Sequence, residues 1–391
     1  MSASLPERAP LLRALIDICG PDFARKAGPA DAVAGRLASF VAAPATTTTV
    51  VDTMRLAADR GLAVVPRGGG TKIDWGLPPL GVDLLLDTGR LAGVWDHRPS
   101  GLTAQVGTGT SVRAVQAALA LRGQRLAVDP PSAEATIGGM LALNESGPLR
   151  HRFGTPSEQV NHVSYVDLDG APGESDGEAG RPGIAEIEGV IVSANLRLVP
   201  LPAARRWVLA SASTPLQVHT LVEEALAQEV EPSAIEVDLP TPPAGRATEP
   251  PPGSLAVLLE GGPASVDERA GRLAKALGDG VTVSEIAPRW WGRYPFGPAD
   301  VALRIAVPIA DLHAAVYALR DATRGPVPVR GSAGIGAVHA VLPGDLHPDQ
   351  VEAVLDTVRS VLMARGGRAV IIAAPPAIAR EVDMAHPRDL F

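Results

Sequence analysis

The chain has 391 residues, of which 46% are apolar and 20% charged, and its formal net charge is −8. This length allows two domains of ordinary size, and the acidic balance without a basic stripe argues against a nucleic-acid-binding protein. The single cysteine, Cys19, excludes a disulfide framework and a thiolate metal site. No apolar run approaches the roughly 18 residues of a membrane span, so we expect a cytoplasmic protein without an integral membrane segment.

The first half alternates between expected helices and strands. Apolar residues recur at helical spacing over 11–19 and 31–40, so residues 1–39 are expected to form a helical segment. Thr49 is the expected N-cap of a helix that ends near Gly61. The pattern further predicts a helix over 112–121, capped by Thr110 or Ser111, and strands over 62–65, 82–86, 91–95, 103–106, 163–168 and 189–199.

Two glycine-bearing segments punctuate this half, and both are expected at strand-to-helix turns. Residues 66–76 read Pro-Arg-Gly-Gly-Gly-Thr-Lys-Ile-Asp-Trp-Gly, so a short apolar strand runs into a loop with few side chains. Such a loop brings backbone N–H groups close to a ligand and suits a diphosphate. The second segment, 129–147, contains Gly138-Gly139, which would let another stretch of backbone approach the same ligand. The first segment lacks the G-x-G-x-x-G fingerprint of a Rossmann domain.

The second half, beyond Pro200-Leu201-Pro202, predicts an α+β domain. Its pattern suggests two β-α-β-like halves that form a mixed or antiparallel sheet covered by helices, although the halves are too dissimilar in sequence to define a repeat. The stretch 169–183 and a proline-rich stretch near 240–252 are expected to be loops. Helices are expected over 215–227, 267–277, 309–323 and 348–365, strands over 207–212, 234–237, 255–259, 281–286, 301–307 and 369–373, and a hairpin region over 327–342.

The first half resembles the FAD-binding domain of the vanillyl-alcohol oxidase and para-cresol methylhydroxylase (PCMH) family, and most closely the FAD-binding subunit of glycolate oxidase. The resemblance rests on residues 65–76, on Leu86-Asp87-Thr88 and on the block 129–150, and it covers about residues 40–202. It implies an α+β fold with an N-terminal helical segment (1–39), a PCMH-type FAD-binding domain of two subdomains (40–202) and an α+β cap or substrate domain (203–391).

The resemblance implies FAD as the cofactor. It would be bound noncovalently, because no histidine lies in or beside the first glycine loop. Each charge-assisted hydrogen bond from the loop to the diphosphate would contribute roughly 1.5–3 kcal/mol. The expected cofactor-binding residues are Pro66, Arg67, Gly68, Gly69, Gly70, Thr71, Lys72, Trp75, Gly76, Pro131, Thr136, Ile137, Gly138, Gly139, Asn144, Ser146, Gly147, Arg150, Val190 and Ile191.

The sequence departs from the family pattern after residue 168. A glycine-rich Lys-Asn-Val-x-Gly-Tyr-Asp stretch that lines the flavin in the family is replaced by the acidic stretch 169–183. The Gly-Ser-x-Gly-Thr-Leu-Gly turn that follows it survives only as residues 186–191. These gaps fall on the isoalloxazine side of the expected site, so diphosphate binding can persist where substrate chemistry is weakened or lost.

Flavin-dependent oxidation of a 2-hydroxy acid needs a base for the hydroxyl proton and a cation for the carboxylate. Arg150, Arg152 and Arg293 are candidates for the cation, and His339 and Tyr294 for the base. In the alternative interpretation, His339 is an ordinary side chain of a strand and the aromatic residues at 290–296 pack a core. The catalytic prediction is His339, Tyr294 and Arg293, and no metal site is expected.

The leading hypothesis is an FAD-linked dehydrogenase or oxidase of a small 2-hydroxy acid such as glycolate or lactate. The resemblance implies that it works as one subunit of a complex with an iron–sulfur partner subunit. The alternative is a degenerate, weakly catalytic or FAD-free paralogue that acts as a scaffold subunit. A different substrate, such as a sugar alcohol, is a third hypothesis, because substrate choice depends on the cap domain, where the resemblance is weakest.

Overall fold

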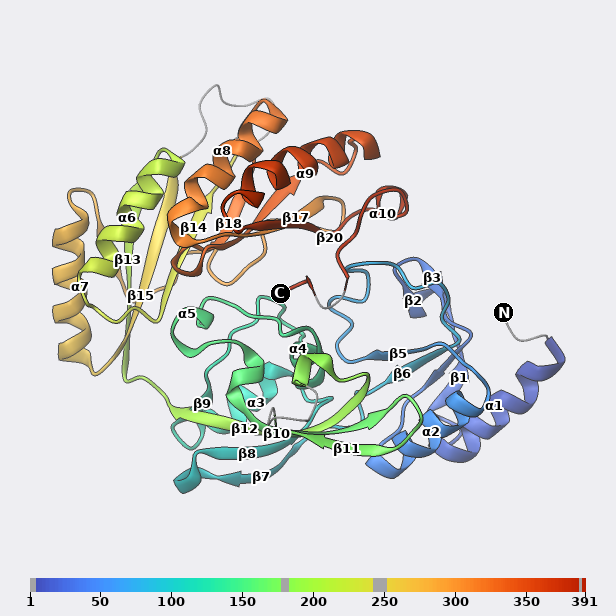
Figure 1. Cartoon of the computed structure of the whole chain (residues 1–391). Coiled ribbons are helices and arrows are strands. Elements are labelled where there is room, and N and C mark those ends of the chain that lie inside the picture. The colour runs from blue at the N-terminus through green and yellow to red at the C-terminus, as the bar shows by residue number, and fades with distance from the viewer. Residues whose placement is uncertain (1–4, 177–182, 242–251, 387–388) are drawn as a thin grey trace. The chain divides into compact units, whose positions relative to one another are not determined.

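The computed structural model describes residues 5–176, 183–241, 252–386 and 389–391. The chain forms two compact units, which are described separately here (Figure 1). Unit 1 comprises residues 1–145, 155–201 and 391, and unit 2 comprises residues 146–154 and 202–390. Parts of the two expected loops, residues 177–182 and 242–251, lie outside the described residues.

Unit 1 contains two main sheets. One has the strand order β1-β4-β6-β5, and the other has the order β11-β10-β12-β8-β7, with β9 paired to β12. The elements are α1 (Leu5–Cys19), β1 (Ala24–Lys26), β2 (Ala32–Val33), β3 (Arg36–Leu37), β4 (Phe40–Ala42), α2 (Thr47–Asp59), β5 (Val64–Arg67), β6 (Leu84–Asp87), β7 (Val94–Arg98), β8 (Thr103–Gly107), α3 (Val112–Ala120), β9 (Gln124–Leu126), α4 (Ile137–Leu143), β10 (Val160–Asp167), β11 (Pro172–Ser175) and β12 (Gly189–Pro200).

Helix termini in unit 1 follow local capping chemistry. The N-cap of α2 is Thr46 rather than Thr49, because Thr46 Oγ1 accepts a hydrogen bond from the backbone N–H of Thr49 at 3.2 Å. Ser111 caps α3 in the same way, with Ala114 N–H as the donor at 3.2 Å. The apolar faces of α2 and α3 then pack against the two sheets in separate buried clusters.

The expected helix over residues 31–40 is wrong. The chain there forms the short hairpin β2–β3 and then enters β4. Ala34 and Gly35 turn the hairpin with φ values of 47° and 75°, a left-handed conformation that a right-handed helix cannot accommodate. Asp31 also directs its carboxylate to side chains and backbone from other segments, as described below. Local turn geometry therefore overrides the apolar spacing.

The first glycine loop does not lead into a helix, contrary to the expectation. The chain passes from β5 to its parallel neighbour β6 through turns, and Thr88 N–H bonds Arg67 O at 2.9 Å where the ladder ends. The second segment does open a helix, α4. The expected loop after residue 168 is also partly wrong, since residues 172–175 form β11 antiparallel to β10.

Unit 2 is an eight-stranded sheet with four long helices on one face and the short α5 (Arg150–Phe153) against the other, an α+β arrangement as expected. Its strand order is β16-β13-β15-β14-β18-β19-β17-β20, and all ladders between these strands are antiparallel. The elements are α5 (Arg150–Phe153), β13 (Ala204–Ala212), α6 (Pro215–Ala227), β14 (Ala234–Leu239), β15 (Gly253–Gly261), α7 (Pro263–Leu277), β16 (Thr282–Ser284), β17 (Val301–Ala306), α8 (Leu312–Thr323), β18 (Val329–Ser332), β19 (Ala337–Leu342), α9 (Pro348–Met363), β20 (Arg368–Ala373) and α10 (Pro376–Ala379).

The two halves of unit 2 share one topology. Each half runs β-α-β-β-α-β, and each places its strands in the order fourth, first, third, second. The halves meet where β14 pairs with β18, so the second strand of each half lies at the centre of the sheet. The two β-α-β-like halves expected from the sequence therefore correspond to two segments of unit 2 with the same topology.

The two faces of this sheet differ in chemistry. Helices α6, α7, α8 and α9 cover one face (Figure 1), and alternate strand residues such as Leu303, Ile305, Val338 and Ala340 pack under them in one core. The other alternate set, which includes Arg304, Arg330 and His339, projects from the opposite face. In the described residues, no helix is both long and apolar enough to cross a membrane.

Candidate functional site

The first glycine loop presents a run of backbone donors. Within the described residues, the N–H groups of 68–72 donate no hydrogen bond, whereas the N–H groups of Ile73 and Trp75 close turns onto Gly70 O and Lys72 O. Gly70 has a φ of 67°, a left-handed conformation of the kind that occurs in anion-binding loops. Unpaired consecutive N–H groups in an accessible loop form an anion-binding concavity. This arrangement fits the diphosphate of FAD.

Close packing also requires glycine at positions 68 and 69. A Cβ on Gly68 would overlap Thr136 Oγ1 and lie 3.2 Å from Thr136 Cβ, and one on Gly69 would overlap the carbonyl oxygen of Glu134. The first loop therefore packs directly against residues 134–136 of the second segment. The glycines permit this packing, and it does not use the N–H groups of residues 68–72 as hydrogen-bond donors.

In the second segment, the backbone N–H groups of residues 137–139 at the start of α4 are already hydrogen-bonded within unit 1. The N–H groups of Ile137 and Gly138 bond Thr110 O and Thr108 O at 2.9 and 2.8 Å, and Gly139 N–H bonds the N-cap Thr136. A Cβ on Gly138 would lie 2.9 Å from Thr108 Cβ. In the structure, these glycines serve the packing of α4 against the end of β8.

A buried ion pair joins the two segments. Lys72 Nζ contacts Glu145 Oε2, and it donates a hydrogen bond to Ser132 Oγ at 2.7 Å. The two charged side chains are only 4% and 1% exposed. Burial lowers the pKa of the Lys72 ammonium, and the charge of Glu145 opposes that shift. Glu145 Oε1 also accepts a hydrogen bond from Ser132 N–H at 3.2 Å, so the pair fixes the second segment to the first.

Aromatic rings cover this ion pair. Lys72 Nζ lies 5.3 Å from the ring centroid of Trp75 and 5.7 Å from that of Phe391, within the range of cation–π attraction. The Trp75 and Phe391 rings are stacked, with centroids 6.1 Å apart. Sequence reasoning did not identify Glu145, Ser132 or Phe391, because no local motif relates them to Lys72.

Other expected cofactor residues of unit 1 have structural partners. Asn144 ends α4 with a φ of 55°, and its Oδ1 accepts a hydrogen bond from Ser157 N–H at 3.0 Å. Val190 and Ile191 are buried in β12, where Ile191 O accepts from Thr108 Oγ1 at 2.6 Å. His97 in β7 has Nε2 2.8 Å from Gln124 Oε1. Pro66 and Gly76 flank the loop, at the end of β5 and in a buried turn.

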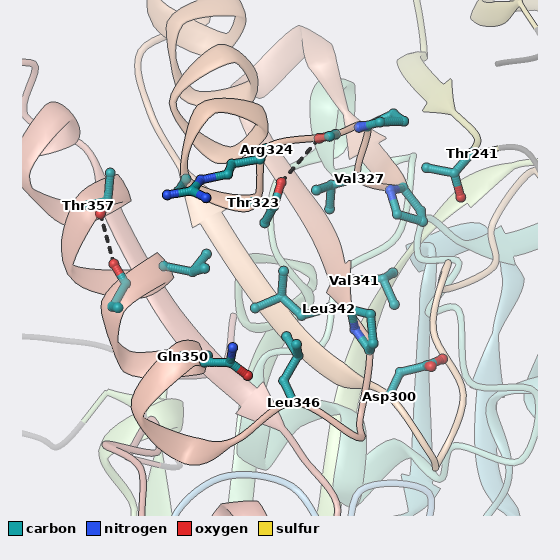
Figure 2. A pocket seen from close by; sticks show the side chains of 17 residues that line it. Thr241, Asp300, Thr323, Arg324, Val327, Val341, Leu342, Leu346, Gln350 and Thr357 are labelled. Atoms are coloured by element: carbon teal, nitrogen blue, oxygen red, sulfur yellow. Dashed lines mark hydrogen bonds between the residues drawn. The ribbon is translucent and has the colours of Figure 1, made fainter. Parts of the chain in front are cut away.

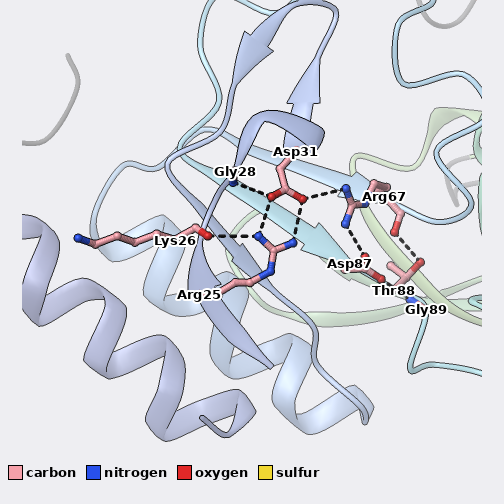
Figure 3. A network of polar contacts seen from close by, with 8 residues as sticks. All are labelled: Arg25, Lys26, Gly28, Asp31, Arg67, Asp87, Thr88 and Gly89. Atoms are coloured by element: carbon pink, nitrogen blue, oxygen red, sulfur yellow. Dashed lines mark hydrogen bonds and ion pairs between the residues drawn. The ribbon is translucent and has the colours of Figure 1, made fainter. Parts of the chain in front are cut away.

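Arg67 belongs to a charge network that holds the start of the glycine loop (Figure 3). Its Nη2 bonds Asp87 Oδ2 at 2.7 Å, and its Nη1 bonds Asp31 Oδ1 at 3.2 Å. Arg25 and Gly28 N–H bond the same Asp31 carboxylate. The Arg25 hydrogen bonds in particular hold the pKa of Asp31 far below its ordinary value, against the effect of burial. The guanidinium of Arg67 is therefore engaged within unit 1.

Asp31→Asn is expected to lower the free energy of unfolding of unit 1 by about 1–3 kcal/mol at pH 7, because charge-assisted bonds to two arginines are lost. A carboxyl whose pKa is lowered in the folded state stabilises the fold above its unfolded pKa of about 4, and that contribution is lost as the pH falls. The variant should therefore lose less stability than wild type between about pH 5 and 3. Urea unfolding across this pH range, with exposed Asp22→Asn as the control, measures both effects. Equal acid sensitivity of wild type and Asp31→Asn would contradict the assignment.

The remaining expected site residues lie in unit 2. Ser146, Gly147 and Arg150 belong to the segment 146–154, which unit 2 contains despite its place in the sequence. His151 in this segment has its Nδ1 3.2 Å from Gly334 O. Because a carbonyl oxygen can only accept, His151 Nδ1–H is the donor of this hydrogen bond. Burial lowers the pKa of His151.

Two of the three expected catalytic residues come together. The rings of Tyr294 and His339 meet edge to face, with centroids 5.1 Å apart. Phe296 lies 5.0 Å from Tyr294 by the same measure. Burial, and then the charge of Arg304, lower the pKa of His339 to about 3, so its imidazole is neutral at physiological pH. Arg293 and Arg152 are exposed.

Arg304 is a site residue that sequence reasoning missed. It lies directly across from His339 in the β17–β19 ladder and is only 5% exposed. Burial, followed by repulsion from Arg368 and Arg150, lowers its pKa to about 10. The signal in the sequence was an arginine flanked on both sides by apolar residues of an expected strand.

A cavity of about 840 Å³ lies elsewhere in unit 2, between α8, α9 and the end of β19 (Figure 2). Its lining is mainly apolar and includes none of the expected site residues, although Asp300 and Arg324 contribute charge. Two threonines that line it donate their hydroxyl protons to backbone carbonyls: Thr323 Oγ1 lies 2.9 Å from Leu319 O and 3.1 Å from Gly325 O, and Thr357 Oγ1 lies 2.8 Å from Ala353 O. Among the described residues, no group of three or more histidine, cysteine or acidic side chains is placed to hold a metal ion.

Comparison with known proteins agrees with the geometry of unit 1. A family described as "FAD binding domain" matches residues 38–172. The glycolate oxidase subunit GlcD of Escherichia coli K12 is 29% identical over 186 residues, which are 44% of this chain and 37% of that protein. The D-lactate dehydrogenase of Archaeoglobus fulgidus is 26% identical over 130 residues, 33% of this chain and 29% of that protein. The chain thus spans only 37% and 29% of the length of these two curated relatives.

Solved structures share the fold at lower sequence identity. An alkyldihydroxyacetonephosphate synthase matches 94% of this chain and 80% of its own with a TM-score of 0.71 and 16% identity. The BBE-like 1 protein of Physcomitrella patens matches 90% of this chain and 88% of its own with a TM-score of 0.65 and 15% identity. Residues 38–172 thus match an FAD-binding domain, the solved structures share the α+β fold, and the matched domain supports FAD as the cofactor.

Proposed function

We propose that this protein oxidises a small 2-hydroxy acid, such as glycolate or lactate, with noncovalently bound FAD as the electron acceptor. The observation that carries the cofactor part is the run of unpaired N–H groups at residues 68–72 in the matched domain. The substrate part is supported by the similarity to a glycolate oxidase subunit and a D-lactate dehydrogenase. The comparisons support an FAD-linked oxidoreductase in general.

The residues of unit 1 would bind and orient the cofactor. The loop 68–72 would donate backbone hydrogen bonds to the diphosphate, and the Lys72–Glu145 pair would hold the two glycine segments together. Bound FAD supplies the acceptor for the two electrons and the hydrogen that leave the carbinol carbon. The hydroxyl proton needs a separate base, and neutral His339, in contact with Tyr294, is our candidate for it.

The experiment is anaerobic mixing of the FAD-loaded protein with candidate substrates. Glycolate or lactate should bleach the visible flavin absorption in a concentration-dependent way, and 1,2-propanediol, which lacks the carboxylate, should not. Bleaching by a sugar alcohol but by no 2-hydroxy acid would replace the substrate class and keep the FAD assignment. FAD-loaded protein that none of these compounds reduces would favour a scaffold role.

We further propose that the protein works as a subunit beside an iron–sulfur partner that takes electrons onward. The support is that the E. coli relative is named as a subunit of glycolate oxidase, and that the described residues hold no metal-ligand group of their own. Co-purification of the tagged chain from its native host tests this. A partner that contains iron and labile sulfide is the expected result, and recovery of the chain alone with full turnover would contradict it.

A further inference from the structure

A buried cation that forms no ion pair with any described residue lies on the face of the unit 2 sheet opposite α6, α7, α8 and α9. Arg304, in the middle of β17, is only 5% exposed. Its Nη1 is buried and has no hydrogen-bond partner, and its guanidinium takes part in no ion pair among the described residues. Burying a charge is unfavourable unless the charge is paired, so this position is suited to an anion that is not part of the chain.

A neighbouring arginine shows how the same face accommodates a paired cation. Arg330 on β18 and Arg304 on β17 both lie opposite His339 on β19, one on each side. Arg330 Nε donates to Asp238 Oδ1 at 2.8 Å, and its Nη1 donates to Tyr294 O at 3.4 Å. Arg330 therefore has a carboxylate partner in unit 2, whereas no carboxylate of the described residues forms an ion pair with Arg304.

The surroundings of Arg304 are positive. Arg150 and Arg368 repel it, whereas Tyr294 and Asp389 attract it more weakly. Asp389 Oδ1 forms an ion pair with Arg368 Nη1 at 3.3 Å, and this pairing weakens the electrostatic attraction between Asp389 and Arg304. An added anion would therefore find a locally cationic environment from which water is largely excluded, where charge-assisted bonds are strong.

His339 supplies a second polar group at the same place. Its Nε2 is buried without a partner, and the ring stands edge-on to Tyr294. Because the imidazole is neutral, it adds no like charge beside Arg304 and can exchange a hydrogen bond with an uncharged hydroxyl. The cation and the neutral nitrogen are cross-strand neighbours, which suits a ligand with a carboxylate and a hydroxyl on adjacent carbons.

We propose that Arg304 and His339 form a carboxylate-binding site, in which Arg304 binds the carboxylate of a small 2-hydroxy acid and His339 Nε2 bonds its hydroxyl. The hydroxy-acid class rests on the function proposed above, whereas the anion site rests on Arg304 itself. A guanidinium matches a carboxylate through two parallel hydrogen bonds. Arg304 thereby replaces the exposed Arg152 and Arg293 as the carboxylate anchor.

The test is the substitution Arg304→Met, read out by thermal unfolding with and without carboxylates. Without ligand, the variant should melt at or above the wild-type temperature, because an unpaired buried charge has been removed. Glycolate, lactate and acetate should raise the melting temperature of wild type, and the concentration of lactate needed for half the effect should be roughly 10- to 100-fold higher in Arg304→Met. 1,2-Propanediol should stabilise neither protein.

Two further variants keep the test decisive. Arg304→Lys retains the charge without the bidentate geometry, so it should weaken lactate binding while melting near wild type, even if Arg304→Met fails to fold. Arg359→Gln on α9, where the arginine pairs with Asp383 at 3.1 Å, is the control and should bind lactate as wild type does. The proposal is overturned if Arg304→Met and Arg304→Lys show wild-type carboxylate half-saturation, or if wild type shows no carboxylate-dependent shift.

This measurement separates the two proposals because it needs no flavin turnover. Carboxylate binding that depends on Arg304, in a protein that lactate and glycolate do not reduce, would keep the anion site and reject the proposed substrate. Reduction of the flavin by lactate with an unchanged KM in Arg304→Lys would keep the proposed function and reject Arg304 as the anchor.

Discussion

Lys72→Met is expected to destabilise unit 1 by about 3–5 kcal/mol, because it leaves the carboxylate of Glu145 buried without its counter-ion. The side chain of Glu145 is 1% exposed, so water cannot readily replace the lost ammonium. The hydrogen bond from Lys72 to Ser132 is lost as well. We therefore expect the first unfolding transition in urea, followed by tryptophan fluorescence of the full chain, to shift to clearly lower urea.

The double variant Lys72→Met/Glu145→Gln should recover most of this loss. Glutamine keeps an oxygen that can accept from Ser132 N–H, and it removes the unpaired charge. Arg98→Met is the control, because its pair with Asp96 is exposed and should contribute no more than about 1 kcal/mol. If Lys72→Met were no more destabilising than Arg98→Met, the buried pair would not be what joins the two glycine segments.

Gly69→Asp is expected to reduce FAD occupancy sharply, for two reasons that separate variants can distinguish. Any Cβ at this position overlaps the carbonyl oxygen of Glu134 and lies 3.1 Å from its carbonyl carbon, so the two segments must move apart. The carboxylate then adds a negative charge near the expected diphosphate. Gly69→Ala has only the first effect, and we expect FAD affinity at least about tenfold lower, equivalent to about 1.4 kcal/mol. Gly69→Asp should lose more.

Gly81 provides matched controls for these variants. A Cβ at Gly81 would have no atom within 4 Å, so Gly81→Ala and Gly81→Asp change the side chain and charge of unit 1 without a clash. Both should bind FAD as wild type does in a fluorescence-quenching titration. A folded Gly69→Asp protein with the FAD affinity of Gly81→Asp would refute the assignment of the loop as the diphosphate site.

The sequence was sufficient to locate the glycine loop and most helices and strands, because these depend on local signals, whereas the role of the loop in FAD binding stays a prediction. The glycines of residues 68–70, the cap at Ser111 and the apolar periods of unit 2 all carry their information within a few residues. The helix expected over 31–40 was wrong because Ala34 and Gly35 form a hairpin turn, and because the Asp31 carboxylate accepts hydrogen bonds from Arg25 and Arg67. The spacing of apolar residues does not reveal such a network.

The parts of the site that the sequence did not reveal depend on long-range pairing. Glu145 becomes notable only when the fold brings it to Lys72. Arg304 becomes notable only when β17 pairs with β19 and no described carboxylate forms an ion pair with its guanidinium. Arg304 resembles any alternating polar residue of a strand, and its paired neighbour Arg330 has the same sequence signal. The different partners of the two arginines follow from strand register.

The measurement that tests the central claim most directly is the visible absorption spectrum of the purified protein, with the flavin released by heat and quantified. We expect a yellow protein that releases close to one FAD per chain without proteolysis, or a colourless one that takes up FAD to that level. Protein that is folded by circular dichroism, carries no flavin and binds none when FAD is added would contradict the account and would favour the scaffold role.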